Sequence, residues 1–361
     1  MEIRAIPFKE IEQYISSDGW DRAEVVPITL ERARSQQYNP QARSDEPSLW
    51  VAEDEDGRVV GFAGSLPAFD VHNSERMGWN TCWWADPDDG KEAAMPLLYH
   101  FLQQWDQKVA FSDMTPHTHE IIRQLGFCNT RRERVAQCYI RIPVSKVISR
   151  LGIPGMILSP LIFPAALLIN SIQGVRVKLS RRRSGVVKSE TRNRLDDALY
   201  GFIEQHRQND FSQRSQEEFS WIEQHHWLVK SSPSTREIGR RYPFSYEVKD
   251  FRMEWLVSRK EGEITSVMLV SVRDGSMKVL YYFGERPGDA FGVLKERIAG
   301  DSSLHSLIFA HPDLLSHVKD IWRVSLYTRF RARHVGVSKK IMDDLPSELV
   351  VQLGDGDAVF T

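Results

Sequence analysis

The sequence predicts a mixed α/β protein (an α+β mixed sheet) with two similar domains in tandem. The chain has 361 residues, which is long for one hydrophobic core and sufficient for two. Strand-like and helix-like stretches alternate in both halves, and the order of the first half returns in the second. Between the halves lies an uncharged stretch, Leu151–Val175. We therefore expect two domains joined by an apolar linker with basic flanks.

The first half predicts a strand, two helical regions, three strands, a helix, a strand, a helix and a strand. Its clearest hairpin surrounds the turn Asp56-Gly57. Apolar residues at helical spacing follow Lys91, and Pro116 suits the first turn of another helix. The predicted ranges are strand 2–6, helices within 8–15 and 20–37, strands 49–53, 59–66 and 77–84, helix 91–107, strand 109–112, helix 116–125 and strand 135–142.

The second half repeats this order after two helices predicted at 191–208 and 215–226. A strand–turn–strand unit surrounds Gly262, and strand–loop–helix units and a final strand at 328–339 follow. Trp50 and Trp255, like Phe111 and Phe309, recur at an offset of roughly two hundred residues, so internal duplication is the simplest account. The predicted division is a domain at 1–142, a linker at 143–186 and a domain at 187–361.

The linker is long enough for a membrane-spanning helix, but Pro154, Pro160 and Pro164 predict a break in regular helix. Basic residues lie on both sides, including the run Arg181–Arg183, and they favour the cytoplasmic side. We therefore expect a shallow loop or broken helix in an anionic membrane surface. A linker buried between domains and a true membrane span are the alternatives.

Composition and charge exclude several classes of protein. The formal net charge is −2, and the basic patch after the apolar stretch is short, so no nucleic acid is expected as partner. Three cysteines lack disulfide or zinc spacing, which indicates reduced thiols in the cytoplasm. Neither His225-His226 nor Asp355-Gly356-Asp357 has supporting ligands, so no metal is expected.

The element order resembles the GNAT acyltransferase fold. Three segments carry the resemblance: WVAEDEDGRVVGFAG, WWADPDDGKEAAMPLL and FSDMTPHTHEIIRQLGF. In that family a loop after a strand-end proline opens a helix, and its amides hold the pyrophosphate of coenzyme A. The resemblance therefore implies acetyl-CoA or another acyl-CoA as donor. The coenzyme contacts that it implies are Trp84, Ala85, Gly90, Lys91, Ala93, Ala94 and Thr115.

The candidate catalytic residues are Asp86, His117 and Asp113. Asp86 ends the coenzyme-facing strand, where a carboxylate could activate an amine, and His117 could act as acid or base. The family's usual tyrosine acid is replaced by Ile122. Two of these candidates also have a structural reading: Asp86 as a helix-start acid, and His117 as a solvated or capping residue. In the second half Phe291 is expected to crowd the corresponding loop, which favours the first half as the coenzyme site.

Tandem halves of this kind resemble acyltransferases of bacterial surface-polysaccharide assembly and, more distantly, Fem-type aminoacyl transferases. The resemblance implies an N-acyltransferase, N-acetyl in the first instance, that acts on an amino sugar or a lipid-linked saccharide at the cytoplasmic membrane face. The alternatives are Fem-like transfer from charged tRNA and a degenerate pair that only binds. Oligomeric state does not follow from these patterns.

Overall fold

The computed structural model describes residues 1–69, 75–182 and 188–360, and these residues form two compact units. The first unit comprises Met1–Glu133, Asn209–Phe251 and Arg333–Thr361, and the second comprises Arg134–Gln208 and Arg252–Ala332. The units thus interleave along the chain, whereas the predicted boundaries followed it in sequence. The predicted domain boundaries at 142 and 187 remain a hypothesis, namely that fragments cut there fold on their own. Arg183 and the predicted end of the linker at 186 lie outside the described residues.

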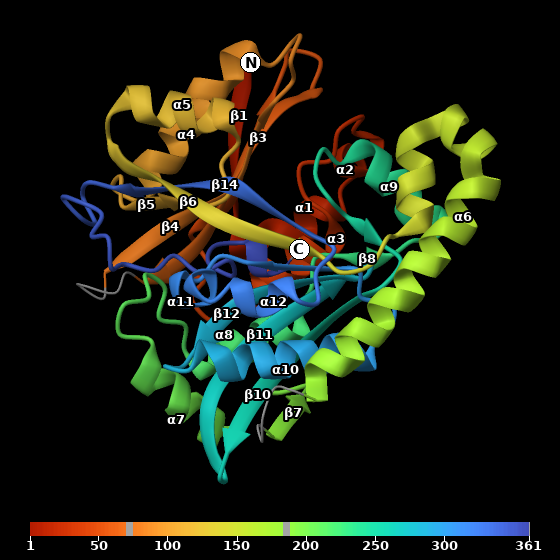
Figure 1. Cartoon of the computed structure of the whole chain (residues 1–361). Coiled ribbons are helices and arrows are strands. Elements are labelled where there is room, and N and C mark those ends of the chain that lie inside the picture. The colour runs from red at the N-terminus through yellow and green to blue at the C-terminus, as the bar shows by residue number, and fades with distance from the viewer. Residues whose placement is uncertain (70–74, 183–187, 361) are drawn as a thin grey trace. The chain divides into compact units, whose positions relative to one another are not determined.

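The first unit contains a mixed sheet in the order β1–β2–β3–β4–β5–β14 (Figure 1). The pairing of β4 with β5 is parallel and the other pairings are antiparallel. The strands are β1 Glu2–Pro7, β2 Pro47–Glu53, β3 Val59–Phe69, β4 Arg76–Ala85, β5 Val109–Phe111 and the later part of β14 Tyr327–Ser338. The helices are α1 Ile11–Ile15, α2 Asp18–Arg22, α3 Leu30–Gln37, α4 Lys91–Gln104, α5 Pro116–Leu125, α8 Gln216–Gln224 and α9 Pro233–Arg241. Two short strands, β8 Val229–Lys230 and β9 Glu247–Val248, form a separate pair.

The second unit repeats that strand order as β7–β10–β11–β12–β13–β6. The β12–β13 pairing is again parallel. The strands are the later part of β6 Cys128–Tyr139, β7 Lys188–Arg192, β10 Phe251–Lys260, β11 Glu263–Arg273, β12 Ser276–Phe283 and β13 Ser306–Phe309. The helices are α6 Val144–Arg182, α7 Asp197–His206, α10 Pro287–Gly300, α11 Pro312–Ser316 and α12 Lys319–Trp322. The mixed α/β class and the repeated element order are therefore confirmed.

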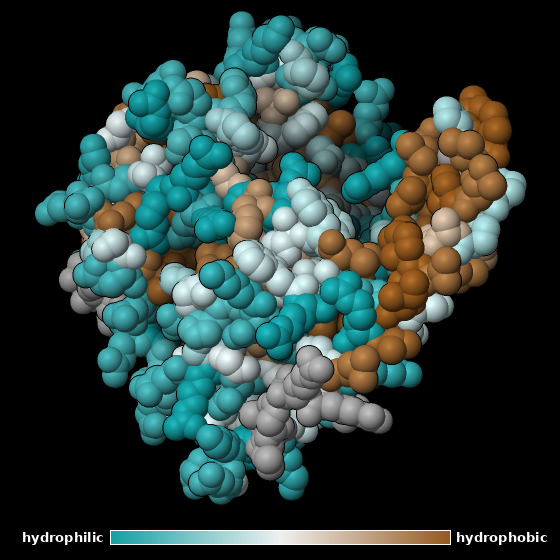
Figure 2. All heavy atoms as spheres, in the orientation of Figure 1, coloured by the Kyte–Doolittle hydropathy of each residue, from teal (hydrophilic) through white to brown (hydrophobic). Residues whose placement is uncertain are grey.

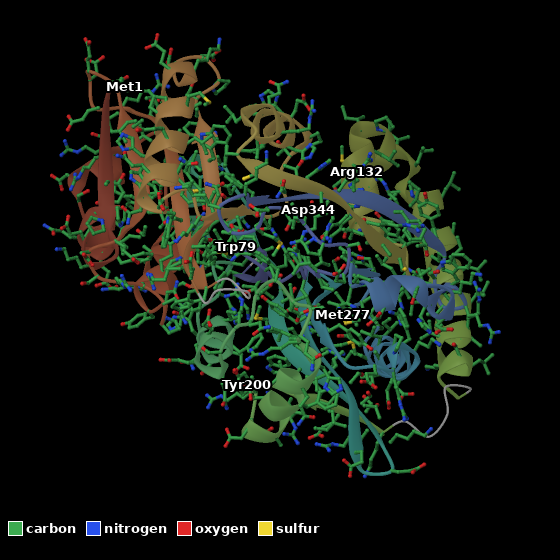
Figure 3. All side chains as sticks on the ribbon, turned by 90° about the vertical axis from the view of Figure 1, so that its left-hand side faces the viewer. Met1, Trp79, Arg132, Tyr200, Met277 and Asp344 are labelled. Atoms are coloured by element: carbon green, nitrogen blue, oxygen red, sulfur yellow. The ribbon has the colours of Figure 1, made fainter. Side chains whose placement is uncertain are left out.

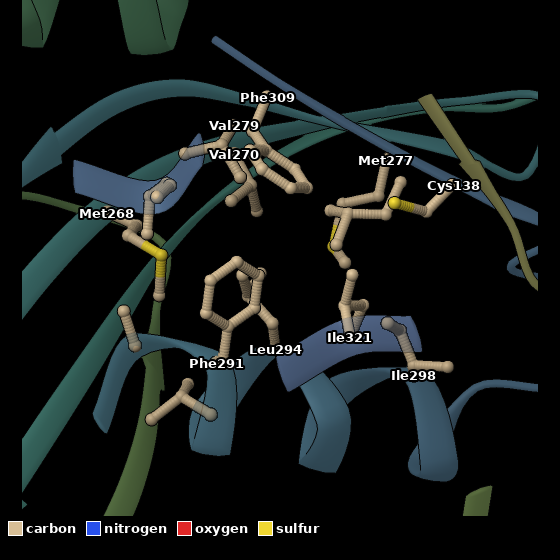
Figure 4. Close-up of a cluster of buried hydrophobic side chains, with 14 of the residues drawn as sticks. Cys138, Met268, Val270, Met277, Val279, Phe291, Leu294, Ile298, Phe309 and Ile321 are labelled. Atoms are coloured by element: carbon tan, nitrogen blue, oxygen red, sulfur yellow. The ribbon is translucent and has the colours of Figure 1, made fainter. Parts of the chain in front are cut away.

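Helix α10 buries one face against the sheet of the second unit. Figure 4 shows Phe291, Leu294 and Ile298 of this helix pointing toward strand residues such as Val270 and Phe309. The rings of Phe291 and Phe309 meet edge to face at 5.5 Å between centroids. Full burial of side chains of this size contributes about 2 kcal/mol each. The prediction that Phe291 crowds the loop before α10 is therefore wrong, because this ring lies in the core.

Two element predictions need correction. Residues 188–192 form strand β7, although helix was predicted from 191, and the helix there begins only at Asp197. Strand β6 begins at Cys128, seven residues before its predicted start at 135. Neither β7 nor the missed part of β6, whose residues 131–134 are all charged, contains an apolar run that a search for strands would find.

Helix α6 carries its apolar side chains outward. Its buried stripe is Ala166, Gln173 and Val177, with the half-buried Asn170 between them. Asn170 is hydrogen-bonded to both backbone groups of Ile142 at 2.8 and 3.1 Å, and Gln173 donates to the carbonyl of Val324. The exposed apolar residues are Leu151, Ile153, Met156, Ile157, Leu158, Leu161, Phe163, Leu167, Leu168, Ile169, Ile172, Val175 and Leu179, which form the brown surface along α6 in Figure 2. This pattern is the reverse of that of a helix packed on a soluble core.

The segment Met156–Ser180 has the length and hydropathy of a membrane span, and 11% of an 18-residue apolar window within it is buried. Helix α6 kinks at Gly152, where φ is +61°, and then runs through Pro160 and Pro164 without interruption. The prediction that these two prolines break the helix is therefore wrong. Pro160 cannot donate to the carbonyl of Met156, but Ser159 Oγ donates to that carbonyl at 2.7 Å instead.

Candidate functional site

In each unit the two parallel strands part before the longer one ends. Strands β4 and β5 pair only over Gly78–Asn80 and Val109–Phe111, and β12 and β13 only over Ser276–Lys278 and Ser306–Ile308. Where the pairing ends, the longer strand carries a bulge, with Thr81 unpaired against β3 and Leu280 unpaired against β11. Bulges concentrate beside active sites, and the carboxyl ends of parallel strands are common ligand sites. These two places are the candidate sites.

In the first unit, the Asp86 side chain accepts hydrogen bonds from the loop amides that were predicted to hold a pyrophosphate. Asp86 Oδ1 accepts hydrogen bonds from the amides of Asp88 at 2.9 Å and Asp89 at 3.0 Å. These bonds, that from Asp89 first, lower the pKa of the Asp86 carboxyl. The Gly90 amide donates to the Asp86 carbonyl at 3.0 Å. Asp86 therefore caps this turn, and a carboxyl with a lowered pKa is a weaker base.

Three predicted coenzyme contacts in the same loop have packing roles. Gly90 lies so close to the neighbouring backbone that a Cβ there would approach the Val60 carbonyl oxygen to 2.2 Å. Ala93 is buried in a core cluster with Trp50 and Leu97. The carbonyl of Ala94 accepts a hydrogen bond from the Trp83 indole at 2.8 Å. Small residues at these positions thus let α4 pack closely on the sheet.

The remaining predicted contacts of this loop lie on both sides of it. The Trp84 ring packs on Phe62 with 5.3 Å between centroids, and Ala85 pairs with Gly61 at the end of β4. Lys91 begins α4 and is exposed, with no acceptor for its side chain among the described residues. Lys91 is thus the one predicted contact here whose side chain is available to an anion.

Asp113, Thr115 and His117 lie together around the start of α5 but apart from Asp86. Asp113 accepts a hydrogen bond from Arg333 Nε at 3.0 Å, and Thr115 caps α5 by accepting from the Thr118 amide at 3.1 Å. His117 is exposed. Phe111 pairs with Asn80 in parallel strands, so Asp113, two residues after Phe111, is level with Cys82. Asp86 lies four residues further along, or about 13 Å away in the strand direction. The structure therefore does not bring the candidate catalytic residues to one point.

The gap after β5 in the first unit is filled by the segment of residues 349–360. Gly356, at φ +71°, lies against Trp79 and Ser112, and a Cβ there would approach Ser112 Oγ to 2.6 Å. The indole nitrogen of Trp79, a residue labelled in Figure 3, and Ser112 Oγ are both buried without a hydrogen-bond partner among the described residues. The Phe360 ring stacks on Trp227 at 4.7 Å. A segment of the chain itself thus stands where the parted strands would admit a ligand.

Arginines hold the 349–360 segment by its carbonyl groups. Arg333 donates to the carbonyls of Val351 at 2.9 Å and Gln352 at 3.0 Å. Arg214 donates to that of Gly356 at 2.8 Å, and Arg131 to that of Leu349 at 2.7 Å. Arg333 and Arg214 are themselves buried. Hydrogen bonds from charged donors are worth about 1.5–3 kcal/mol each, so this segment is firmly fixed.

The corresponding loop of the second unit, Gly284–Arg286, is more open. Gly288, in the first turn of α10, has no atom within 4 Å of a Cβ placed on it. Beside this loop lies a cavity of about 800 Å³, whose charged lining comprises the cations Arg259, Lys260 and Arg286 and the carboxylates Asp197, Glu261, Glu263 and Glu285. Of these groups, the open helix start and Arg286 next to it suit a phosphate group.

A ring pair that the sequence did not indicate lies at the parted ends of β12 and β13. His311 follows β13, and its ring lies 4.8 Å from that of Tyr282 near the end of β12. His311 Nδ1 accepts from the Asp313 amide at 3.3 Å, and burial lowers the pKa of His311 to about 4. A neutral imidazole whose Nδ1 accepts a hydrogen bond carries its proton on Nε2. His311 caps α11 as Thr115 caps α5, so the two residues hold corresponding positions in the two units. The repeat of the chain at an offset of roughly two hundred residues was the one sequence signal that could have indicated His311.

No family model matches the chain, and no curated protein matches it in sequence. The solved structures that it resembles include GCN5-related N-acetyltransferases and other acyltransferases, the resemblance that the motifs predicted. A probable N-acyltransferase from Enterococcus faecalis has 10% identity and a TM-score of 0.47, with 94% of this chain and 73% of that chain covered. A tandem GNAT protein of clavulanic acid biosynthesis has 10% identity and a TM-score of 0.44, with 93% and 98% covered.

Saccharomyces cerevisiae N-myristoyltransferase with bound myristoyl-CoA has 12% identity and a TM-score of 0.48, with 93% of this chain and 78% of that chain covered. Similarity of fold at this level of identity is no evidence of a shared substrate.

Proposed function

We propose that this chain is an N-acyltransferase that uses acetyl-CoA or another acyl-CoA as donor. The observation that carries the proposal is the bulged strand that parts from its parallel neighbour and leads into a helix start, found in both units. Such a strand end offers unpaired backbone groups to a ligand, and the helix start attracts phosphate.

The second unit supports this function better than the first. The thioester would supply the acyl carbon for attack by an amine, with the coenzyme thiol as leaving group. Arg286 and the amides at the start of α10 would bind phosphate, and the proton that the attacking amine loses would pass through water to the departing thiolate. In the first unit, Asp86, Asp113 and His117 stay predicted catalytic residues, and the Lys91→Glu variant tests the predicted coenzyme contacts.

The proposed acceptor is an amino sugar or a lipid-linked saccharide at the cytoplasmic face of a membrane. The outward apolar side chains of α6 support this part of the proposal, because such a surface is stable against lipid and costly in water. The enzyme would then act as a peripheral membrane protein.

Calorimetry with acetyl-CoA tests the donor and its location. Gly288→Glu places a carboxylate at the open start of α10, and Lys91→Glu reverses the exposed charge at the start of α4, so neither variant disturbs packing. We expect loss of binding in Gly288→Glu and unchanged binding in Lys91→Glu. The reverse result would place the donor in the first unit. A wild-type protein that binds neither acetyl-CoA nor a longer acyl-CoA would refute the function itself.

A further inference from the structure

The second unit has another cavity, at the opposite ends of the strands that form the candidate donor site. Its volume is about 620 Å³, and its lining includes Ser276 and Ser306, the first residues of β12 and β13, and Tyr139, the last residue of β6. The start of α6 and the start of β14 complete its walls. We call it the basic cavity.

The basic cavity has positive charge without negative charge. The described residues that line it include no Asp or Glu, and its cations are Arg141, Lys146, Arg150, Arg329 and Arg331. Cations that line a concave surface raise the local concentration of anions. The ligand that this cavity suits is therefore an anion.

Two of these cations are fixed by the protein, and three are available. Arg141 donates to the carbonyls of Ile298 at 3.1 Å and Asp301 at 3.2 Å, and Lys146 donates to that of Asp274 at 3.1 Å. The guanidinium groups of Arg150, Arg329 and Arg331 are exposed and have no acceptor among the residues that the structure describes. Arginine forks of this kind bind phosphate oxygens in pairs.

His305 adds a polar group that the protein does not satisfy. This residue lines the cavity, and its Nδ1 is buried without a hydrogen-bond partner in the described part of the chain. Burial, and then the charge of Lys146, lower the pKa of His305, so its ring stays neutral. A neutral ring does not add to the repulsion among the five cations.

The cavity also has apolar lining residues, and one of them continues into the exposed apolar face of α6. Ile142, Val147, Ile169 and Leu326 line it, and Ile169 also belongs to the exposed apolar face of α6 (Figure 2). An anion with a hydrocarbon chain would therefore find charge inside the cavity and apolar surface beyond it.

Exposed aromatic residues lie beside the same surface. Trp322 and Tyr327 are exposed on the segment whose Val324 carbonyl accepts a hydrogen bond from Gln173 of α6. Tryptophan and tyrosine are enriched where protein meets the headgroup region of a bilayer.

We propose that the basic cavity binds the phosphate group of a membrane lipid, with the lipid chains lying along α6. This proposal names a ligand class for the proposed membrane-face function. The choice of a lipid as the source of the phosphate rests on that function. Phosphate is favoured because three arginine forks are available, and a lipid is favoured over free phosphate because Ile169 joins the cavity to the apolar face.

Calorimetry with soluble probes tests the cavity apart from any membrane. Dodecyl phosphate below its critical micelle concentration should bind the full-length protein. The double variant Arg329→Ala, Arg331→Ala should weaken that binding roughly tenfold or more. Lys178→Ala removes an exposed cation of α6 outside the cavity and should leave binding unchanged. Equal loss in both variants would show surface charge only and overturn the site.

Two further probes test whether the bound phosphate group belongs to a lipid and whether the anion is a phosphate. Inorganic phosphate that binds as tightly as dodecyl phosphate would overturn the lipid source. Dodecanoate that binds as tightly would overturn the choice of phosphate.

Vesicle flotation separates this proposal from the proposed function. The wild type should float with vesicles that contain phosphatidic acid, and Leu161→Ser with Leu168→Ser should abolish flotation while dodecyl phosphate still binds. A wild type that binds dodecyl phosphate but floats with no vesicle would refute the membrane face and leave the phosphate site. Acetyl-CoA binding, measured in parallel, should not change in any of these variants.

Discussion

The two units share a strand order and a bulge, but they fill the space between the parted strands differently. In the first unit, the Asp86 carboxylate takes the loop amides, and Gly356 packs against Trp79 and Ser112. In the second, the start of α10 is open beside a cavity, and His311 faces Tyr282. The shared backbone arrangement therefore leaves a space between the parted strands in both units. The residues around that space determine whether the chain itself fills it or leaves it open to a ligand.

The largest expected difference between the units concerns pH. An unfolded histidine binds a proton below about pH 6.5, but folded His311 binds one only below about 4. Protonation between these values therefore favours the unfolded state, and the free energy of unfolding should fall by about 3 kcal/mol as the pH drops through this window. Chemical denaturation of the wild type and of His311→Asn at several pH values measures this.

His311→Asn keeps a side-chain acceptor for the Asp313 amide but does not titrate, so its profile should be flatter from pH 6.5 to 4. The corresponding residue of the first unit, Thr115, does not titrate, and Thr115→Ser serves as control with the profile of the wild type. Parallel profiles for His311→Asn and the wild type would contradict the burial of this imidazole.

The second difference compares two glycines at corresponding helix starts. Gly90→Ala brings a Cβ within 2.2 Å of the Val60 carbonyl oxygen, which the backbone can avoid only by moving. We expect a loss of about 2 kcal/mol or more in the free energy of unfolding. Gly288→Ala meets no atom within 4 Å and should stabilise by about 0.5 kcal/mol. Thermal and urea unfolding give both values, and changes of the same sign would contradict this difference in packing.

The smallest expected effect concerns the Asp86 carboxylate. Its lowered pKa means that the stability it contributes is present above about pH 3.9, the unfolded value, and is lost as the pH falls through the folded value. NMR titration should show the Asp88 and Asp89 amide signals moving together below pH 4, and Asp86→Asn should remove that movement. Amide signals that stay still in the wild type would show that the carboxylate does not cap this loop.

Local patterns predicted most of the elements correctly. The hairpin around Asp56-Gly57, the Pro116-started helix and the repeated order all depend on residues close in sequence. Strand β7 was missed because Lys188–Arg192 has no apolar run. The burial of Phe291 was missed because a residue near a loop was judged by its place in the chain and not by its face of the helix.

The candidate site was less predictable, because its important contacts join distant residues. Arg333 reaches Asp113 across more than two hundred positions, and Gly356 reaches Trp79 across more still. No local spacing encodes such pairs. The Asp86 bonds to Asp88 and Asp89 are local, and the reading of Asp86 as a helix-start acid did anticipate a structural role.

The interleaved chain also has a consequence for synthesis on the ribosome. The edge of β5 pairs with Gly336 and Val337, which follow Phe111 by more than two hundred residues. At about 5–20 residues per second, this edge waits on the order of 10–50 s for its partner. The first unit is thus begun before the second and finished after it. An unpaired strand edge recruits other strands during such a delay. Nascent chains of this protein should therefore depend on chaperones that shield the early sheet until Gly336 and Val337 emerge.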